Sequence, residues 1–212
     1  TLMMTVLPLA KIGRLLGRQE YVDEAVYQFL LHVQNLMDRQ TGLWFHGWSY
    51  EGNHNFANAR WARGNSWLTI VIPDFLEVVD LPERDPVRRY LIQVLENQVA
   101  ALEKCQDESG LWHTLLDDPT SYLEASATAG FATGILKAVR KRYIDKRYAA
   151  VAEKAVRGIV ANISDDGELL QTSFGTGMGH DLAFYRQIPL TSMPYGQAMA
   201  ILCLSEYMYK YF

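Results

Sequence analysis

Apolar residues recur at helical spacing along almost the whole chain, and the apolar–polar alternation that marks a β-strand is nearly absent. This pattern predicts an all-α protein. The expected helices cover about residues 1–16, 20–38, 61–79, 85–104, 121–141, 145–162 and 193–210. Glycines and the Leu81-Pro82 step interrupt the pattern between several of them.

Two helix starts carry cap signals. Ser121 followed by Glu124 has the spacing of a capping box, which predicts that the fifth helix begins there. Pro194 suits the first turn of the last helix, with Ser192 before it as the cap.

The connections between the expected helices alternate in length. Tight turns join the first helix to the second, the third to the fourth and the fifth to the sixth. The other connections, about residues 39–60, 105–120 and 163–192, are long. Loops of this length inside a compact domain are usually functional.

The long loops also resemble one another. The run Asp38-Arg-Gln-Thr-Gly-Leu-Trp-Phe-His46 is echoed by Asp107-Glu-Ser-Gly-Leu-Trp-His113, and more weakly by residues 165–170. A repeated unit of tight helical hairpin plus long loop indicates a helical toroid or solenoid, although these residues are also common in loops. In a toroid the long loops share one face, and the helices near 1–16, 61–79, 121–141 and 193–210 form the inner layer.

Composition narrows the class of protein. The chain has 212 residues, 49% of them hydrophobic, and a net charge of -4. These values suit one soluble globular domain and argue against general nucleic-acid binding. An acidic ligand would need a local basic patch. No stretch approaches the ~20 apolar residues of a membrane span, so no membrane partner is expected.

Cofactor chemistry has little support in the sequence. Cys105 and Cys203 form no metal or redox motif, and the five histidines lack paired ligand spacing. We therefore expect neither a metal nor another cofactor. Reduced thiols and the absence of a signal-peptide pattern predict a cytoplasmic location. The chain begins at Thr1 already in apolar periodicity, which leads us to expect a longer natural chain with further N-terminal helices.

The densest chemical cluster begins at Gly42 and ends at Trp67. It holds four of the five tryptophans, together with His46, Arg60 and Arg63. Indole rings stack on the C–H faces of sugars, and guanidinium groups bind carboxylates in a bidentate manner. Each residue alone has a structural alternative, such as core packing for a tryptophan. Their concentration in one long loop and the helix after it favours a ligand site.

Two motifs in this cluster resemble a known family. The segment Gly42-Leu-Trp-Phe-His-Gly-Trp48, followed by Trp61-Ala-Arg-Gly-Asn-Ser-Trp67, is similar to the signature of the unsaturated rhamnogalacturonyl hydrolases, glycoside hydrolase family 105, related to the unsaturated glucuronyl hydrolases of family 88. Thr1–Ala10 resembles the family's helix after its catalytic Trp-x-Asp segment. Residues 121–126 and 175–179 resemble later family segments more weakly.

The resemblance implies a fold and a reaction. The fold would be an (α/α)6 six-hairpin barrel, and the seven expected helices would cover roughly its C-terminal half as a single domain. The substrate would be a pectin fragment with an unsaturated galacturonyl residue linked to rhamnose. An Asp would protonate C4 of the C4=C5 double bond, and water would add at C5. The resulting hemiketal would open and release the rhamnose-containing partner.

The resemblance also assigns roles residue by residue. His46 and Arg63 match substrate-contacting positions, with Arg63 expected on the substrate carboxylate. Trp61 and Trp67 match aromatic site residues on which the sugar would stack. The loop between His46 and Arg63 is shorter than is usual in the family, which leaves the rim of the site and a preference for longer substrates open.

The family's catalytic Asp would lie just upstream of Thr1, so no catalytic acid is assigned within residues 1–212. The pairs Asp117-Asp118 and Asp165-Asp166 sit in turns, where Asp commonly bonds the local backbone. Asp74 is expected to partner a buried polar group. His180 follows a glycine run that would either let the backbone approach a sugar or form a flexible turn.

Three functional hypotheses follow. The first is hydrolysis of unsaturated galacturonyl-rhamnose in pectin degradation. The second keeps the fold and changes the substrate to unsaturated glucuronyl units of other uronic oligosaccharides. The third is a non-catalytic carbohydrate-binding or helical-repeat protein. Residues 1–212 alone are also expected to expose apolar surface on the first and last helices and to self-associate.

Overall fold

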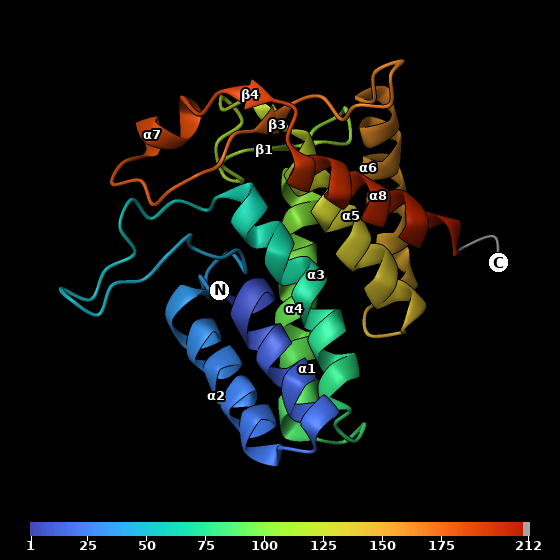
Figure 1. The fold of residues 1–212 in the computed structure, drawn as a ribbon. Coiled ribbons are helices and arrows are strands. Elements are labelled where there is room, and N and C mark those ends of the chain that lie inside the picture. Colours follow the sequence, from blue (N-terminus) through green and yellow to red (C-terminus); the bar gives the residue numbers. More distant parts are fainter. Residues whose placement is uncertain (210–212) are drawn as a thin grey trace.

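The computed structural model describes residues 1–209, which form packed layers of helices with long loops at one end (Figure 1). The helices are η1 (Leu2–Val6, π-helical), α1 (Leu7–Leu16), α2 (Gln19–Leu36), α3 (Ala62–Val79), α4 (Pro86–Cys105), α5 (Ala125–Arg140), η2 (Lys146–Tyr148, 3-10), α6 (Ala149–Ala161), α7 (Leu182–Arg186) and α8 (Pro194–Met208). The strands are β1 (Trp112–His113), β2 (Leu123–Glu124), β3 (Thr172–Ser173) and β4 (Leu190–Thr191). All the expected helices are present. The expected end of the last one, at residue 210, lies outside the described residues.

The fifth helix does not begin at Ser121. Glu124 is the N-cap of α5, and its carboxylate accepts a hydrogen bond from the Ala127 N–H at 2.5 Å. The Ser121 hydroxyl instead donates to the Asp118 carbonyl at 2.8 Å. Pairing of β2 with β1 holds residue 124 in an extended conformation, so the helix can start only after it.

The start of the last helix is predicted only in part. Pro194 occupies its first turn as expected, but the residue before the helix is Met193, which makes no side-chain cap bond. The prediction of Ser192 as the cap is wrong, because the helix starts one residue too late for it.

Consecutive hairpins build an inner and an outer layer. The inner helices α1, α3, α5 and α8 pack one after another, and α2, α4 and α6 cover α1, α3 and α5 from the other side. This order of layers confirms the one expected from the alternating connections. The tight turns lie at one end of the helices, and the long loops with β1 to β4 and α7 lie at the other (Figure 1).

The echo among the long loops is a repeated turn. In each of the three loops, a backbone N–H at the start of the turn donates to the carbonyl of a residue four or five positions later. The donor and acceptor residues are Asp38 and Leu43 at 2.8 Å, Asp107 and Leu111 at 3.0 Å, and Ser164 and Glu168 at 2.9 Å. Each turn contains a glycine at positive φ: Gly42 at 83°, Gly110 at 90° and Gly167 at 82°. The sequence repeat therefore corresponds to a structural repeat.

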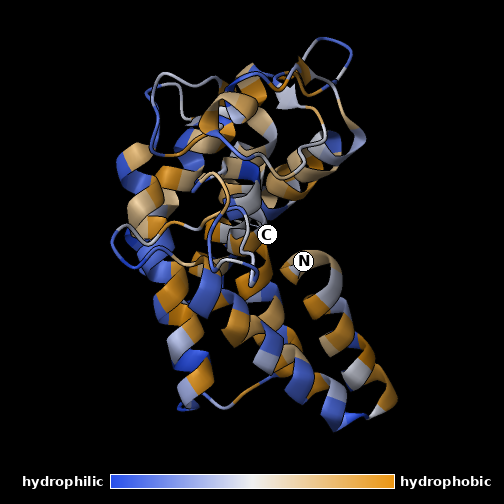
Figure 2. Cartoon of the chain, turned by 90° about the vertical axis from the view of Figure 1, so that its left-hand side faces the viewer, coloured by the Kyte–Doolittle hydropathy of each residue, from blue (hydrophilic) through white to orange (hydrophobic). Residues whose placement is uncertain are grey.

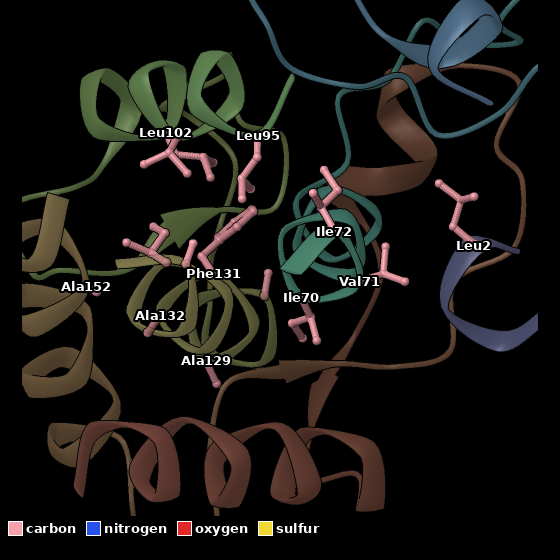
Figure 3. Packing of buried hydrophobic residues seen from close by; sticks show 14 of the residues in the cluster. Leu2, Ile70, Val71, Ile72, Leu95, Leu102, Ala129, Phe131, Ala132 and Ala152 are labelled. Atoms are coloured by element: carbon pink, nitrogen blue, oxygen red, sulfur yellow. The ribbon is translucent and has the colours of Figure 1, made fainter. Parts of the chain in front are cut away.

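The core lies between the layers. Phe131 of α5 points toward Leu95 and Leu102 of α4, and Ala129 faces α8 (Figure 3). Small residues let α5 approach its neighbours closely. An added Cβ at Gly134 would collide with the Thr69 carbonyl of α3. The two central helices are thus held in backbone contact at the centre of the molecule.

Most helices alternate hydrophobic and hydrophilic segments, as amphipathic helices do (Figure 2). The helices at the two ends of the layer also present apolar side chains to solvent. Leu15 of α1 is 83% exposed and Ile201 of α8 is 58% exposed. Among residues 1–209, no helix combines the length and apolar character that crossing a bilayer requires.

Candidate functional site

A cavity of about 800 Å3 opens beside the N-terminus of α3. Its walls come from η1, one face of α2, the loop at residues 44–56, the start of α3, and Met178. The lining side chains include Trp44, His46, Trp48, Tyr50, Phe56, Trp61 and Trp67. Among the described residues that line it, none is Asp, Glu, Lys or Arg. The wall is therefore aromatic and formally uncharged apart from the two histidines His32 and His46.

The start of α3 positions the tryptophans. Trp61 is the residue before the helix, with extended backbone, and the N–H of Ala62 donates to the Thr114 carbonyl of the next long loop at 2.8 Å. Because the helix begins only at Ala62, Trp61 and Trp67 both reach the cavity. A helix that included Trp61 would have turned the two side chains about 120° apart.

Asn65 ties the preceding loop to this helix. Its buried side-chain amide accepts from the Trp44 N–H and donates to the Trp44 carbonyl, both at 2.8 Å. The Gln98 amide of α4 donates to the Asn65 carbonyl at 3.0 Å. Asn65 thereby fixes the loop that carries His46 against α3, although the sequence offered no separate signal for this role.

His46 lies where the long loop after α2 meets the last long loop, which contains α7. Its backbone N–H donates to the Ala59 carbonyl at 2.9 Å, its ring packs on Trp61 with centroids 4.4 Å apart, and its Nδ1 lies 2.6 Å from the Tyr185 hydroxyl. Burial, and after it the charge of Arg63, lowers the pKa of His46 from 6.5 to about 4. The imidazole is therefore neutral at neutral pH and acts as a hydrogen-bonding group.

Arg63 does not line the cavity. Its guanidinium is 4% exposed and lies between the Trp61 and Tyr195 rings, 4.8 Å from each centroid. Its Nη1 donates to the Ser173 carbonyl at 2.9 Å and its Nη2 to the Phe174 carbonyl at 3.0 Å.

Further partners surround the same guanidinium. Its Nη2 donates to the Thr176 hydroxyl at 3.0 Å, and Nη1 lies 3.4 Å from Glu124 Oε1. The carboxylate of Glu124 also accepts from the Ser173 N–H at 2.8 Å. The terminal nitrogens that would grip a substrate carboxylate are thus already engaged. In this structure Arg63 holds the chain after β3 against α3 and α5.

Of the four predicted site residues, the structure brings His46, Trp61 and Trp67 together on the cavity wall and places Arg63 one layer behind it. Tyr185 was not predicted. In the sequence it stood only within the stretch around His180, whose own side chain is exposed and packs against Phe56 without lining the cavity itself.

Three of the other carboxylates considered in the sequence have charged partners. Asp117 and Asp118 lie in a turn, where they pair with Arg60 at 2.6 Å and Arg186 at 2.7 Å. Asp74 pairs with the half-buried Lys137 at 2.5 Å. These ion pairs join neighbouring loops or helices, and none of the three carboxylates lines the cavity.

Neither cysteine is in a disulfide: Cys203 is buried and Cys105 half-buried. Burial raises the pKa of both thiols to about 12, so they behave as apolar core side chains. Within residues 1–209, no three His, Cys, Asp or Glu side chains gather in a group that could hold a metal ion.

Solved structures share this arrangement of helices. A crystal structure from Salmonella enterica serovar Paratyphi A, described as a possible member of the GH105 family, matches with a TM-score of 0.99 and 82% identity over 100% of this chain and 56% of that one. A C. acetobutylicum glycoside hydrolase from family 105 matches with a TM-score of 0.88 and 28% identity over 98% of this chain and 64% of that one. The fold is that of helical glycoside hydrolases.

The sequence comparisons narrow this class. The unsaturated rhamnogalacturonyl hydrolase YesR of Bacillus subtilis is 32% identical over 207 residues, which are 97% of this chain and 58% of that protein. Residues 1–211 match the model of Glycosyl Hydrolase Family 88, and the chain belongs to this family. The resemblance found in the sequence is confirmed. The chain spans little more than half the length of these relatives, 58% of YesR and 56% of the Salmonella protein.

Proposed function

We propose that the full-length protein hydrolyses oligosaccharides with an unsaturated galacturonyl residue linked to rhamnose, as formed in pectin degradation. The observation that carries this proposal is the match to YesR, named an unsaturated rhamnogalacturonyl hydrolase, along 97% of the chain. The aromatic cavity supports it, because indole rings beside hydrogen-bonding groups suit a sugar ring.

The proposed reaction is hydration of a double bond followed by collapse of the product. A carboxylic acid donates its proton to C4 of the C4=C5 enol ether, and water activated by a carboxylate adds to C5. The hemiketal formed at C5 then opens and breaks the bond to the rhamnose-containing partner. The rule that relates carboxylate spacing to retention or inversion does not apply to this route.

The proposed substrate contacts are His46, Trp61 and Trp67. The half-buried Trp67 offers its ring to a sugar, whereas Trp61 is only 7% exposed and already packs against His46 and Arg63, so it borders the substrate. His46 offers one uncharged imidazole nitrogen. The direct contact of Arg63 with the substrate carboxylate is replaced in this proposal by an indirect role, because its terminal nitrogens are engaged with Ser173, Phe174 and Thr176. A substrate carboxylate would then be met by uncharged donors at the cavity.

The proposed catalytic acid lies upstream of Thr1 in the full protein. Two observations support this position. None of the described residues on the cavity wall carries a carboxylate, and Thr1 itself lines the cavity. Residues that directly precede Thr1 would therefore meet the cavity. The proposal also includes the remaining N-terminal helices and a closed six-hairpin ring.

A second candidate substrate is an unsaturated glucuronyl unit. A relative from Alteromonas, named unsaturated 3S-rhamnoglycuronyl hydrolase, is 27% identical over 76% of this chain. An assay therefore has to determine which uronic acid the substrate contains and in which order the two sugars are linked. Non-catalytic sugar binding is the third candidate, and the cytoplasmic location stays a prediction.

The test is the loss of the ultraviolet absorbance of the C4=C5 bond. The full-length protein and the 212-residue chain are compared on unsaturated galacturonyl-rhamnose and on unsaturated glucuronyl disaccharides. We expect turnover of the rhamnoside by the full-length protein alone. Turnover by residues 1–212 would refute the upstream acid, and turnover of glucuronides only would establish the second candidate. Sugar binding without loss of absorbance would reduce the protein to a binding module.

Substitutions connect the activity to the cavity. His46→Gln in the full-length protein should lower kcat/KM by about tenfold to a hundredfold, the effect of losing one or two hydrogen bonds. The control is Arg140→Met, which removes a charged side chain that pairs with Glu206 of α8 and does not line the cavity. Equal activity of the His46 variant and wild type would remove His46 from the proposed contacts.

A further inference from the structure

The hydrogen bond between His46 and Tyr185 determines which imidazole nitrogen carries the proton. Tyr185 is fully buried, and its hydroxyl has three neighbours: His46 Nδ1 at 2.6 Å, the Gly179 N–H at 3.2 Å and Met178 Sδ at 3.9 Å. The Gly179 N–H can only donate, so the phenol oxygen accepts from it. The phenol proton then needs an acceptor of its own.

Two arrangements of protons are conceivable. If Nδ1 carried the proton and donated to the phenol, the Tyr185 O–H would be left with a thioether sulfur at 3.9 Å, which is a weak acceptor. If the phenol donates to Nδ1, every group is matched: the hydroxyl donates once and accepts once. Leaving a buried donor unmatched is unfavourable, so the second arrangement is preferred. The imidazole proton then lies on Nε2.

We propose that Tyr185 is a positioning residue that holds His46 as the Nε2–H tautomer, so that His46 serves as a hydrogen-bond donor in the cavity. Within the described residues Nε2 has no protein partner, and His46 lines the cavity. A ligand would therefore place an oxygen acceptor, such as a hydroxyl or carboxylate oxygen, opposite Nε2. The tautomer itself is independent of the reaction, whereas the donation to substrate rests on the proposed function.

The surroundings of Tyr185 fit this role. Its ring packs with Ala59, Trp61 and Leu115 in a small cluster separate from the main core. Gly179 brings its N–H to the hydroxyl, and a side chain at that position would collide with Phe184 and Tyr185. This contact gives a structural role to one glycine of the run at residues 175–179, a run whose role the sequence alone left open.

The short helix that carries Tyr185 is fastened at both ends. The Asp181 carboxylate accepts from the Phe184 N–H at 2.8 Å, and Arg186 pairs with Asp118 of the preceding long loop at 2.7 Å. The phenol therefore approaches His46 from a segment anchored to a different loop from the one that carries His46. Tyr185 thereby contacts both the His46 ring and Trp61.

The direct test is nitrogen-15 NMR of the full-length protein labelled at histidine, with the His46 signal assigned from the His46→Gln variant. The long-range coupling pattern separates the Nε2–H from the Nδ1–H tautomer. We expect wild-type His46 in the Nε2–H form, and mixed tautomers in Tyr185→Phe. A wild-type Nδ1–H form, or the same single tautomer in both proteins, would overturn the proposal whatever the enzyme's substrate.

Kinetics supply the second readout. Tyr185→Phe keeps the buried ring and should lower kcat/KM by about tenfold, the effect of one misplaced hydrogen bond. The matched control is Tyr148→Phe, because Tyr148 is equally buried and its hydroxyl accepts from Arg147 at 2.6 Å away from the cavity. Equal losses in the two variants would indicate a general effect on folding and refute the positioning role. Absence of turnover in wild type would count against the proposed function and leave the NMR result decisive for the tautomer.

Discussion

Replacing Arg63 with methionine in the full-length protein should destabilise the fold before it affects any substrate contact. The substitution keeps the aliphatic stem and removes a guanidinium that is 4% exposed. Glu124, whose side chain is 1% exposed, would lose its cationic neighbour at 3.4 Å. The carbonyls of Ser173 and Phe174 would each lose one donor, at 2.9 and 3.0 Å, and would keep the Tyr195 and Thr176 hydroxyls respectively.

Two estimates of the loss agree. Removing one partner of a buried ion pair typically costs about 3–5 kcal/mol. Counted separately, two hydrogen bonds from a charged donor at about 1.5–3 kcal/mol each give a similar total. Glu124 retains the Ala127 and Ser173 N–H donors and the Ser126 hydroxyl, which keeps the loss from being larger. We therefore expect the free energy of unfolding to fall by about 3–5 kcal/mol.

The assay is urea unfolding followed by tryptophan fluorescence, with Arg140→Met as the control. Arg140 pairs with Glu206 at 2.6 Å but is 37% exposed, so its loss should change stability by about 1 kcal/mol or less. Arg63→Met combined with Glu124→Gln should deviate from additivity by about 0.5–3 kcal/mol, because the two side chains touch. Unchanged stability together with a sharp rise in KM would refute this reasoning and restore Arg63 as a direct ligand.

Three further predictions concern single side chains. The pKa of His46 is 6.5 in the unfolded chain and about 4 in the fold, so only the unfolded chain binds this proton between those values. Stability should thus decrease by up to roughly 3 kcal/mol as pH falls from 6.5 to 4, and His46→Gln should flatten that part of a pH series of urea midpoints. Gly110→Ala should destabilise far more than Gly167→Ala in the same unfolding assay, because a Cβ at Gly110 collides with the Lys154 carbonyl while Gly167 has nothing within 4 Å. Equal effects would mean that positive φ alone matters. Cys203, buried and with its pKa raised to about 12, should react with a thiol reagent only after unfolding, and rapid labelling of the native protein would contradict its placement.

The helices could be predicted closely because most of them bury one apolar face, and burial of one face imposes the helical period on the sequence. The fifth helix shows where this signal ends. The spacing of Ser121 and Glu124 fits a capping box, but β1 draws residues 123–124 into a strand pair and delays the helix to Ala125. A pair of two-residue strands leaves no period to detect. The five-residue α7 is also too short for one, and it went unpredicted.

The sequence predicts which residues gather at the site but not how they are arranged in space. His46, Trp61 and Trp67 were found because they are close in sequence, and they do meet on the cavity wall. Arg63 was expected beside them because its chemistry suits a carboxylate ligand. The partners that bury it are 61 to 113 residues away, at Glu124 and at Ser173 to Thr176. No local pattern announces contacts at such separations, and the same holds for Tyr185, 139 residues from His46.

The charged side chains of Arg63 and Glu124 lie behind the cavity wall, and this limits the chemistry that the wall itself can perform. Burying an ion costs free energy unless it is paired, and the buried Arg63 is paired with Glu124 one layer below the aromatic surface. The wall itself offers rings and His46, whose pKa of about 4 leaves it neutral at neutral pH. A neutral imidazole can donate a hydrogen bond, but it is a far weaker proton donor than an imidazolium. His46 is therefore suited to donate a hydrogen bond to a ligand rather than to supply the proton at C4 in the proposed reaction.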